Sequence, residues 1–221
     1  MISTPLRLAV FDCDGTLVDS QSSIVDAMFA ACDHHEFTRP DAEAVRRMVG
    51  LPLEVAIQRL LPQVDVDLSL VMSETYKSAF LDMRKAGAVE EPLYPGVLQV
   101  MDDLDAAGWL MGIATGKAMR GLKRTLEHHE LTGRFVTQQT ADIAQGKPHP
   151  EMMLNALSET GVEAANAVMI GDTTFDVEMA VNAGVQCIGV AWGYHETQEL
   201  MDAGAKMVVH SADELMTALL S

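Results

Sequence analysis

The chain has 221 residues, of which 48% are hydrophobic and 21% are charged. These proportions are typical of a globular protein that buries a sizeable core, and they argue against a disordered or fibrous chain. With 15 lysines and arginines against 32 aspartates and glutamates, the formal net charge is −17, which disfavours long-range attraction to nucleic-acid phosphates or to an anionic membrane.

Short, uninterrupted apolar runs recur along the chain and predict strands buried on both faces of a parallel sheet. The first is Leu8–Phe11, and it ends abruptly at Asp12. Segments with helical periodicity separate it from the later runs, and this alternation is typical of a doubly wound α/β sheet. The later predicted strands are 110–114, 167–170, 185–190 and 207–209, and the predicted helices are 96–107, 118–129, 150–159, 174–183, 198–203 and 212–220.

One part of the chain interrupts this alternation. From about residue 20 to 88 the apolar residues follow helical spacing only, which predicts helices without strands. The linker 90–96 contains two prolines, and proline cannot continue a preceding helix. We therefore expect a discontinuous core formed by residues 1–17 and 90–221, with an all-helical cap inserted at 18–89.

Polar residues at the strand ends are the candidate site residues, because ligands of open parallel sheets bind beyond the carboxyl ends of the strands. Asp12, Thr115 and Asp172 follow predicted strands, Lys147 precedes a predicted helix, and Asp176 comes four residues after Asp172. Each one alone has a structural interpretation, as a helix cap, a turn or a solvated loop. Taken together, they can converge on one crevice.

Three carboxylates in one crevice require a nearby cation. Asp12, Asp172 and Asp176 would repel one another by about 4 kcal/mol per close pair at an effective dielectric constant of about 20. Carboxylate oxygens without nitrogen or sulfur ligands favour a hard dication. We therefore expect Mg²⁺ at this position, with Lys147 as a fixed positive charge.

Four motifs in this order carry a resemblance to a known family. The sequence DCDGTLVDS at 12–20 resembles the opening motif of the haloacid dehalogenase superfamily of phosphohydrolases. Thr115 matches the second motif of that family, Lys147 in GKPHP matches the third, and GDTTFD at 171–176 matches the fourth. The resemblance covers nearly the whole chain, including a helical cap after the first strand, and it implies a Rossmann-like core.

The resemblance also implies a role for each motif residue. Asp12 would be the nucleophile that forms an aspartyl-phosphate, and Asp14 would be the general acid and base. Thr115 and the backbone N–H of Gly116 would bind the transferring phosphoryl group, and Lys147 would offset its charge.

The same resemblance implies a set of metal ligands. Asp12, the carbonyl oxygen of Asp14, and Asp172 would hold Mg²⁺, and Asp176 would contact it directly or through water.

Two further features indicate which branch of the superfamily this sequence resembles. An aspartate at position 14 favours phosphate esters, because an alkoxide leaving group needs a proton. The cap segment RRMVGLPL at 46–53 is similar to the caps of phosphoglycolate phosphatases, which makes 2-phosphoglycolate one candidate substrate. Arg46 or Arg47 would then reach the crevice and bind a second anionic group of the substrate, although a solvated helix face explains both arginines equally well.

The leading hypothesis is a Mg²⁺-dependent phosphomonoesterase that acts on a small phosphorylated metabolite. A phosphosugar mutase of the beta-phosphoglucomutase type is the alternative within enzymes, and a phospho-accepting receiver-like signalling module is the alternative of another class. A receiver needs neither the helical insertion nor a second carboxylate at Asp14. We expect no nucleic-acid or membrane partner.

The expected location is the cytoplasm. No apolar run approaches the roughly 18 residues of a membrane span, and Asp12 and Asp14 precede any secretory core. The three cysteines have no metal-binding spacing and are expected to be free thiols.

Overall fold

The structure is a computed structural model that describes residues 5–220. Its core is a six-stranded sheet in the order β3-β2-β1-β4-β5-β6, and every neighbouring pair of strands is parallel. The central strand β1 pairs with β2 and β4, and Leu8 is opposite both Leu110 and Ala167. The strands are β1 (Leu8–Phe11), β2 (Leu110–Thr115), β3 (Thr137–Thr140), β4 (Ala167–Gly171), β5 (Gln186–Val190) and β6 (Met207–Val209).

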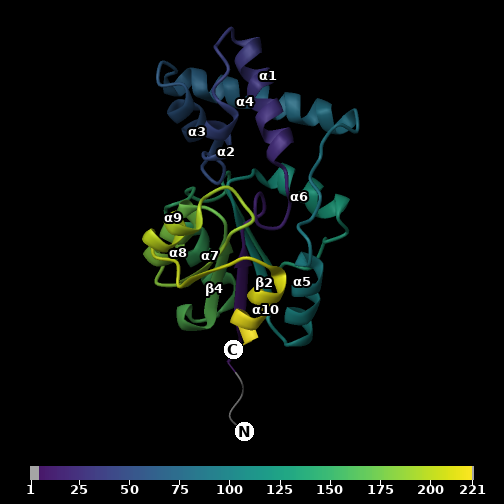
Figure 1. Ribbon diagram of the computed structural model, residues 1–221, viewed down its shortest axis with the longest axis vertical. Helices are drawn as coiled ribbons and strands as arrows, with labels where there is room; N and C mark the ends of the chain where they lie inside the picture. The colour runs from purple at the N-terminus through teal and green to yellow at the C-terminus, as the bar shows by residue number, and fades with distance from the viewer. Residues whose placement is uncertain (1–4, 221) are drawn as a thin grey trace.

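Helices cover both faces of this sheet, as Figure 1 shows. One hydrophobic cluster contains residues of α5 (Val97–Ala106), α6 (Met119–His128) and α10 (Ala212–Leu220). A second contains residues of α7 (Glu151–Thr160), α8 (Thr174–Asn182) and α9 (Thr197–Asp202), and a short 3-10 helix, η1 (Ala164–Asn166), precedes β4. The predicted doubly wound α/β fold with an inserted helical cap is therefore confirmed.

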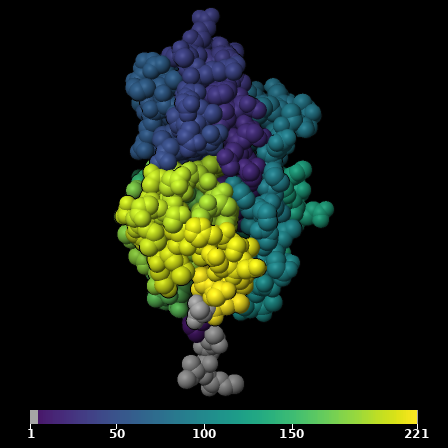
Figure 2. Space-filling model, viewed as in Figure 1, coloured from purple at the N-terminus to yellow at the C-terminus, as the bar shows by residue number. Residues whose placement is uncertain are grey.

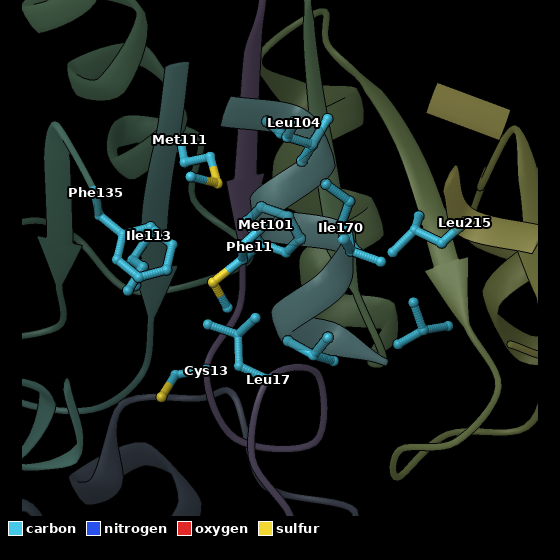
Figure 3. Packing of buried hydrophobic residues seen from close by; sticks show 14 of the residues in the cluster. Phe11, Cys13, Leu17, Met101, Leu104, Met111, Ile113, Phe135, Ile170 and Leu215 are labelled. Atoms are coloured by element: carbon cyan, nitrogen blue, oxygen red, sulfur yellow. The ribbon is translucent and has the colours of Figure 1, made fainter. Parts of the chain in front are cut away.

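The fully buried strand β1 supplies side chains to both hydrophobic clusters. Leu8 and Val10 belong to one cluster, and Ala9 and Phe11 belong to the other, as the alternation of side chains along a strand requires. Figure 3 shows Phe11 in the middle of its cluster, and its ring meets that of Phe135 edge to face at 6.5 Å. Burying one such aromatic side chain contributes about 1.5 to 3 kcal/mol, so the core fixes the strand that carries Asp12 at its end.

The predicted elements of the core agree with the structure to within one residue at each end, but strand β3 was not predicted. Its sequence is TQQT, which has no apolar residue. Thr137 and Gln139 are nevertheless buried, because Gln139 donates to Thr137 at 2.9 Å and Thr137 donates to Glu159 of α7 at 2.5 Å. Polar side chains that satisfy one another can thus line a strand at the edge of the sheet.

The helices α1 to α4 form a separate cap above the carboxyl ends of the strands, as Figure 1 shows. In the space-filling view of Figure 2 the cap is the purple and blue part at the top. They pack around a hydrophobic cluster of their own that includes Met28, Ile57 and Met72. Asp65 caps the longest of them, because its side chain accepts a hydrogen bond from the N–H of Leu68 at 2.9 Å. The cap helices are α1 (Gln21–His34), α2 (Ala42–Arg46), α3 (Leu53–Leu60) and α4 (Val66–Lys85).

The two segments that connect the cap to the core are hydrogen-bonded to each other. The N–H of Asp19 donates to the carbonyl of Pro92 at 2.8 Å. The Ser23 hydroxyl donates to the carbonyl of Glu90 at 3.1 Å and accepts from the Glu90 N–H at 3.0 Å. The division of the chain into 1–17, 18–89 and 90–221 stays a prediction. Within residues 5–220, no helix combines the length and apolar character needed to cross a membrane.

Candidate active site

The expected site residues meet at the carboxyl ends of three neighbouring strands. Asp12 follows β1, Thr115 ends β2, and Asp172 follows β4. Lys147 reaches them from the loop between β3 and α7, where its side chain is completely buried. The sheet order places β1 between β2 and β4, so Asp12 lies in the middle of the group.

The two carboxylate oxygens of Asp12 have different surroundings. Oδ1 accepts a hydrogen bond from the N–H of Cys13 at 2.6 Å, and it lies 2.9 Å from Nζ of Lys147. Oδ2 is buried and has no hydrogen-bond partner among the described residues. One oxygen therefore holds the carboxylate in place, and the other is available to a ligand.

Asp172 is held by the backbone and side chains around it. Its Oδ1 accepts from the Thr16 hydroxyl at 2.8 Å, and its Oδ2 accepts from the N–H of Tyr194 at 2.9 Å. Gly15 and Gly193 pack against this side chain so closely that a Cβ on either would overlap it. These contacts hold the side chain of Asp172 in one position.

Asp176 serves the local structure and the site at once. Its Oδ2 accepts from the N–H of Thr173 at 3.0 Å and from the Thr173 hydroxyl at 2.7 Å. The N–H of Asp176 in turn donates to the Thr173 hydroxyl, and together these bonds form the capping box of α8. Its Oδ1 contacts Nζ of Lys147, so one oxygen caps the helix and the other faces the cluster.

The three aspartates form a cluster that fits a dication. Carboxylate oxygens of Asp12, Asp172 and Asp176 lie within 4.8 Å of one another. Burial raises the pKa of Asp12 to about 7, with Lys147 opposing this shift and Asp176 adding to it. Burial, Asp12 and Asp176 also raise the pKa of Asp172 well above its ordinary value.

Lys147 supplies only one positive charge to these three carboxyl groups. The all-oxygen donor set of the cluster suits Mg²⁺. Asp12, Asp172 and Asp176 are therefore the described residues that fit this ion.

Asp14 is held by a residue that the sequence analysis did not single out. Nζ of Lys117 lies 2.5 and 2.6 Å from the two carboxylate oxygens of Asp14. The Ser20 hydroxyl donates to one of these oxygens at 2.5 Å. The position of Lys117 two residues after Thr115 was the available signal, since the same turn carries it to the carboxyl end of the sheet.

The segment after β2 touches the cap through its backbone. The Thr115 hydroxyl accepts from the N–H of Lys117 at 3.2 Å. A Cβ on Gly116 would lie 2.7 Å from the carbonyl oxygen of Gly50, and a Cβ on Gly146 would overlap the ring of Pro52. The cap loop at 50–52 thus rests directly on two glycines of the core.

A cavity of about 500 Å³ extends from the site into the space beneath the cap. Asp12, Asp14, Thr115 and Gly116 line its core side. Most of its remaining wall comes from α1, α4 and the segment 45–60. The cavity gives a substrate access to Asp12 and Asp14, and the cap encloses what extends beyond them.

The structure places Arg46 and Arg47 away from the crevice, and a contact of either with substrate stays a prediction. Arg46 pairs with Glu43 of its own helix at 2.9 Å. Arg47 pairs with Glu199 of α9, and its carbonyl oxygen lies 3.1 Å from Nε2 of His195. Within the described chain, neither arginine lines the cavity. The helical pattern could not show which way α2 faces, and Arg47 in fact joins the cap to the outer surface of the core.

Comparison with known proteins agrees with this geometry. Residues 9–190 match the family model of haloacid dehalogenase-like hydrolases. The chain is 37% identical over 216 residues to the probable phosphatase IndB of Dickeya dadantii, an alignment that covers 96% of this chain and 92% of IndB. It is 32% identical over 219 residues to a phosphoglycolate phosphatase of Pseudomonas putida, with 95% of this chain and 78% of that protein covered.

A solved structure has the same architecture throughout. The crystal structure described as a predicted phosphatase from Clostridium acetobutylicum superposes with a TM-score of 0.88 at 26% sequence identity. The superposition covers 98% of this chain and 99% of that one. The similarity therefore includes the cap as well as the sheet.

Proposed function

Because the chain belongs to the haloacid dehalogenase-like hydrolases, we propose that it is a Mg²⁺-dependent phosphomonoesterase that works through an aspartyl-phosphate on Asp12. Its phosphatase relatives make it a hydrolase that acts on phosphate esters. The observation that carries the covalent mechanism is the buried Oδ2 of Asp12, which has no hydrogen-bond partner within residues 5–220 and belongs to a residue that lines the cavity.

In the first half-reaction, Oδ2 of Asp12 attacks the phosphorus atom of the bound ester. The bond between phosphorus and the ester oxygen breaks, and that oxygen leaves with the electron pair. A protonated Asp14 gives it a proton, so the product departs as a neutral alcohol. Asp14 is suited to this role because it lines the same cavity as Asp12.

In the second half-reaction, water attacks the same phosphorus atom and breaks its bond to Asp12. Asp14, now a carboxylate, takes the proton of the attacking water. Inorganic phosphate leaves, Asp12 regains its carboxylate, and Asp14 is protonated again. Lys117 and Ser20 support this step because they hold Asp14 in one orientation.

Other residues stabilise the charge of the phosphoryl group during both steps. Lys147 offsets the charge of Asp12, and Thr115 and the N–H of Gly116 offer hydrogen bonds to phosphoryl oxygens. Mg²⁺ held by Asp12, Asp172 and Asp176 would supply the further positive charge that brings a dianionic ester next to a carboxylate.

The relatives named phosphoglycolate phosphatase make 2-phosphoglycolate a compound to assay. The cavity and the second carboxylate, Asp14, favour a hydrolase over a receiver module, which has no use for either. The expected compartment remains the cytoplasm, in keeping with the free thiols of Cys13, Cys32 and Cys187.

The test is release of inorganic phosphate by the purified protein with Mg²⁺, from a panel that contains 2-phosphoglycolate, hexose phosphates and nucleoside monophosphates. Acid-quenched samples are digested, and the peptide that contains Asp12 is examined by mass spectrometry for a phosphoryl group. We expect phosphate release and a labile phosphopeptide. Production of an isomeric sugar phosphate without phosphate release would favour the mutase, and hydrolysis without phosphopeptide in any quench would contradict the covalent route.

A further inference from the structure

The cavity as a whole has the size, and its wall beyond Asp14 has the lining, of a site for a substrate that carries a ring. A volume of about 500 Å³ lies within the range of about 300 to 1,000 Å³ for sites that enclose drug-sized ligands. A two-carbon acid such as glycolate would leave most of this space to water. Much of the wall beyond Asp14 is apolar, and its apolar side chains include Ile24, Met28, Met48, Val49, Leu53 and Leu81.

Two aromatic rings of α4 form one wall of this space. Tyr76 and Phe80 both line the cavity, and their ring centres are 6.1 Å apart with an angle of 33° between the planes. Both side chains are only half-buried, although they pack against the hydrophobic cluster of the cap. Part of each ring is therefore open to whatever occupies the cavity.

The aromatic wall lies next to the position of the leaving group. Nζ of Lys117 is 5.8 Å from the ring centre of Phe80 and 2.5 Å from Oδ1 of Asp14. Asp14 is the residue that would protonate the departing oxygen. A flat group a few bonds from that oxygen would thus reach Phe80 and Tyr76.

Most of the basic side chains that line the cavity form salt bridges with acidic residues. Lys117 is paired with Asp14, Lys77 with Glu74 at 2.8 Å, and Arg84 with Glu91 at 2.5 Å. Of the basic residues that line the cavity in the described chain, Arg120 and Arg124 of α6 have no salt bridge. The apolar side chains of the wall favour an uncharged group, and Arg120 and Arg124 are the two cations that could bind a second anion instead.

Tyr76 adds one polar contact to the apolar wall. Its hydroxyl makes no hydrogen bond to a described residue, in contrast to Tyr194, whose hydroxyl lies 3.5 Å from that of Ser20. Burial raises the pKa of Tyr76, with Lys117 opposing the shift and Asp14 adding to it. The hydroxyl therefore stays protonated and can donate to a polar atom on the edge of a ring.

We propose that the preferred substrate is a phosphate monoester whose alcohol carries an uncharged, flat ring, and that this ring packs against Tyr76 and Phe80. The inference rests on the proposed phosphomonoesterase function and specifies its substrate class. Ring packing combines aromatic contact with apolar burial, so the ring should raise kcat/KM about tenfold or more.

The experiment compares substrates that share the reacting bond and differ in the ring. One pair is 2-phenylethyl phosphate and ethyl phosphate, and the other is uridine 5′-monophosphate and ribose 5-phosphate. Within each pair a primary alkoxide leaves, so the chemistry is matched. We expect a higher kcat/KM for the compound with the ring in at least one pair. The pair with the larger ratio of kcat/KM shows which spacing between ring and phosphate fits the cavity.

Variants then locate the preference. Phe80→Ala should reduce the ratio of kcat/KM between the ring compound and its partner about tenfold. Phe29→Ala is the matched control, because Phe29 also packs against the cap cluster but does not line the cavity, and its ratio should equal that of the wild type. Calorimetric binding of the same pairs to Asp12→Asn gives a readout that does not depend on turnover.

The outcomes separate this inference from the proposed function. Phosphate release from both members of each pair at equal kcat/KM, with equal binding to Asp12→Asn, would overturn the ring site and leave the phosphatase intact. A clear preference for 2-phosphoglycolate that is lost in Arg124→Ala would also overturn it, in favour of an anionic substrate. Ring-selective binding to Asp12→Asn, together with no hydrolysis of any ester by the wild-type protein, would support the ring site and contradict the phosphatase.

Discussion

Nζ of Lys117 bridges the two carboxylate oxygens of Asp14 at 2.5 and 2.6 Å. The two residues come from different strand ends, after β2 and after β1. Burial lowers the pKa of Lys117, but Asp14, Cys13 and Glu91 together outweigh burial and raise this pKa above its ordinary value. Lys117 is therefore an ammonium group that holds both carboxylate oxygens of Asp14 in one orientation.

Lys117→Met should slow both half-reactions. Without the ammonium, Asp14 loses the contact that holds both of its carboxylate oxygens, so it is less well oriented to give and to take a proton. We expect kcat to fall roughly tenfold, a part of the hundredfold or more that general acid and base catalysis contributes. Single-turnover quench experiments measure the rate of each half-reaction.

Lys123→Met is the control for this variant. It removes an exposed lysine from α6, the helix that follows Lys117, and should leave the rates of both half-reactions unchanged. Unchanged rates in Lys117→Met would show that Lys117 does not act through Asp14.

Asp12→Asn and Asp14→Asn should fail at different points. Asp12→Asn lacks the nucleophile, so hydrolysis should fall to background and no phosphopeptide should form. Asp14→Asn keeps the nucleophile but loses acid and base catalysis, which predicts a loss of about 10²- to 10⁴-fold in kcat. Single-turnover quench experiments measure both, and substantial turnover by Asp12→Asn would refute the covalent mechanism.

Metal binding should stabilise the fold, and more so at high pH. The raised pKa of Asp12, about 7, means that the folded metal-free protein keeps a proton that the unfolded chain has released at its ordinary value of 3.8. The free energy of unfolding should therefore fall as pH rises from about 4 to 7. Mg²⁺ would bind the deprotonated cluster and restore the free energy of unfolding that is lost at high pH.

At a hundredfold excess over its Kd, Mg²⁺ should add about 2.7 kcal/mol, or about 5 to 10 °C in Tm for a chain of this size. Thermal melts with Mg²⁺ and with EDTA at about pH 5 and pH 8 test this. EDTA should also abolish activity, and Ca²⁺ should inhibit because its coordination is looser. An equal Tm with and without Mg²⁺ at pH 8 would contradict the binding of Mg²⁺ by the aspartate cluster.

The two neighbouring arginines of the cap should behave differently. Arg47 joins the cap to Glu199, so Arg47→Ala should weaken the closed position and lower kcat/KM by the same factor for every substrate. The pair is about one-third exposed, so the effect should not exceed about 1 kcal/mol, or about fivefold. Arg46→Ala is the matched control and should change nothing. A loss confined to carboxylate-bearing substrates would instead restore a direct role in specificity.

Gly116→Ala should separate cap closure from stability. Its Cβ would lie 2.7 Å from the carbonyl oxygen of Gly50, so the cap could no longer rest on the core, although Gly116 keeps its own N–H. We expect kcat/KM to fall at least tenfold for large and small substrates alike, with Tm within about 2 °C of the wild type. Normal kcat/KM in this variant would mean that turnover does not need the closed contact.

The strands and helices of the core were predictable because burial on both faces of a parallel sheet leaves an apolar run in the sequence. Strand β3 was not, since Thr137 and Gln139 satisfy one another and leave no apolar signal. The positions of Asp12, Thr115 and Asp172 followed from the strand ends alone. Lys117 was missed because pairing between two loops depends on side-chain direction, which no sequence period reports.

In the cap, too, the sequence predicts the helices but not the direction of individual side chains. Helical spacing predicts that 20–88 is helical, but it does not fix the rotation of α2 or the side of α4 that faces the site. Arg46 and Arg47 were equally compatible with a place over the crevice and with a solvated helix face, and Arg47 pairs with Glu199 of the core. Tyr76 and Phe80, by contrast, line the cavity without a motif to mark them. Strand order orients the core residues, while packing between helices orients those of the cap.

The hydrogen bonds between Asp19 and Pro92 and between Ser23 and Glu90 have an evolutionary consequence. They bring the start and the end of the helical insertion to one point on the core. The sheet therefore depends only on this junction and not on the number of residues inserted between its two sides. Lengthening such an excursion costs little entropy, about 0.6 kcal/mol for each doubling. Recombination at this junction can exchange the whole recognition surface in one event while the aspartates beneath it keep their places.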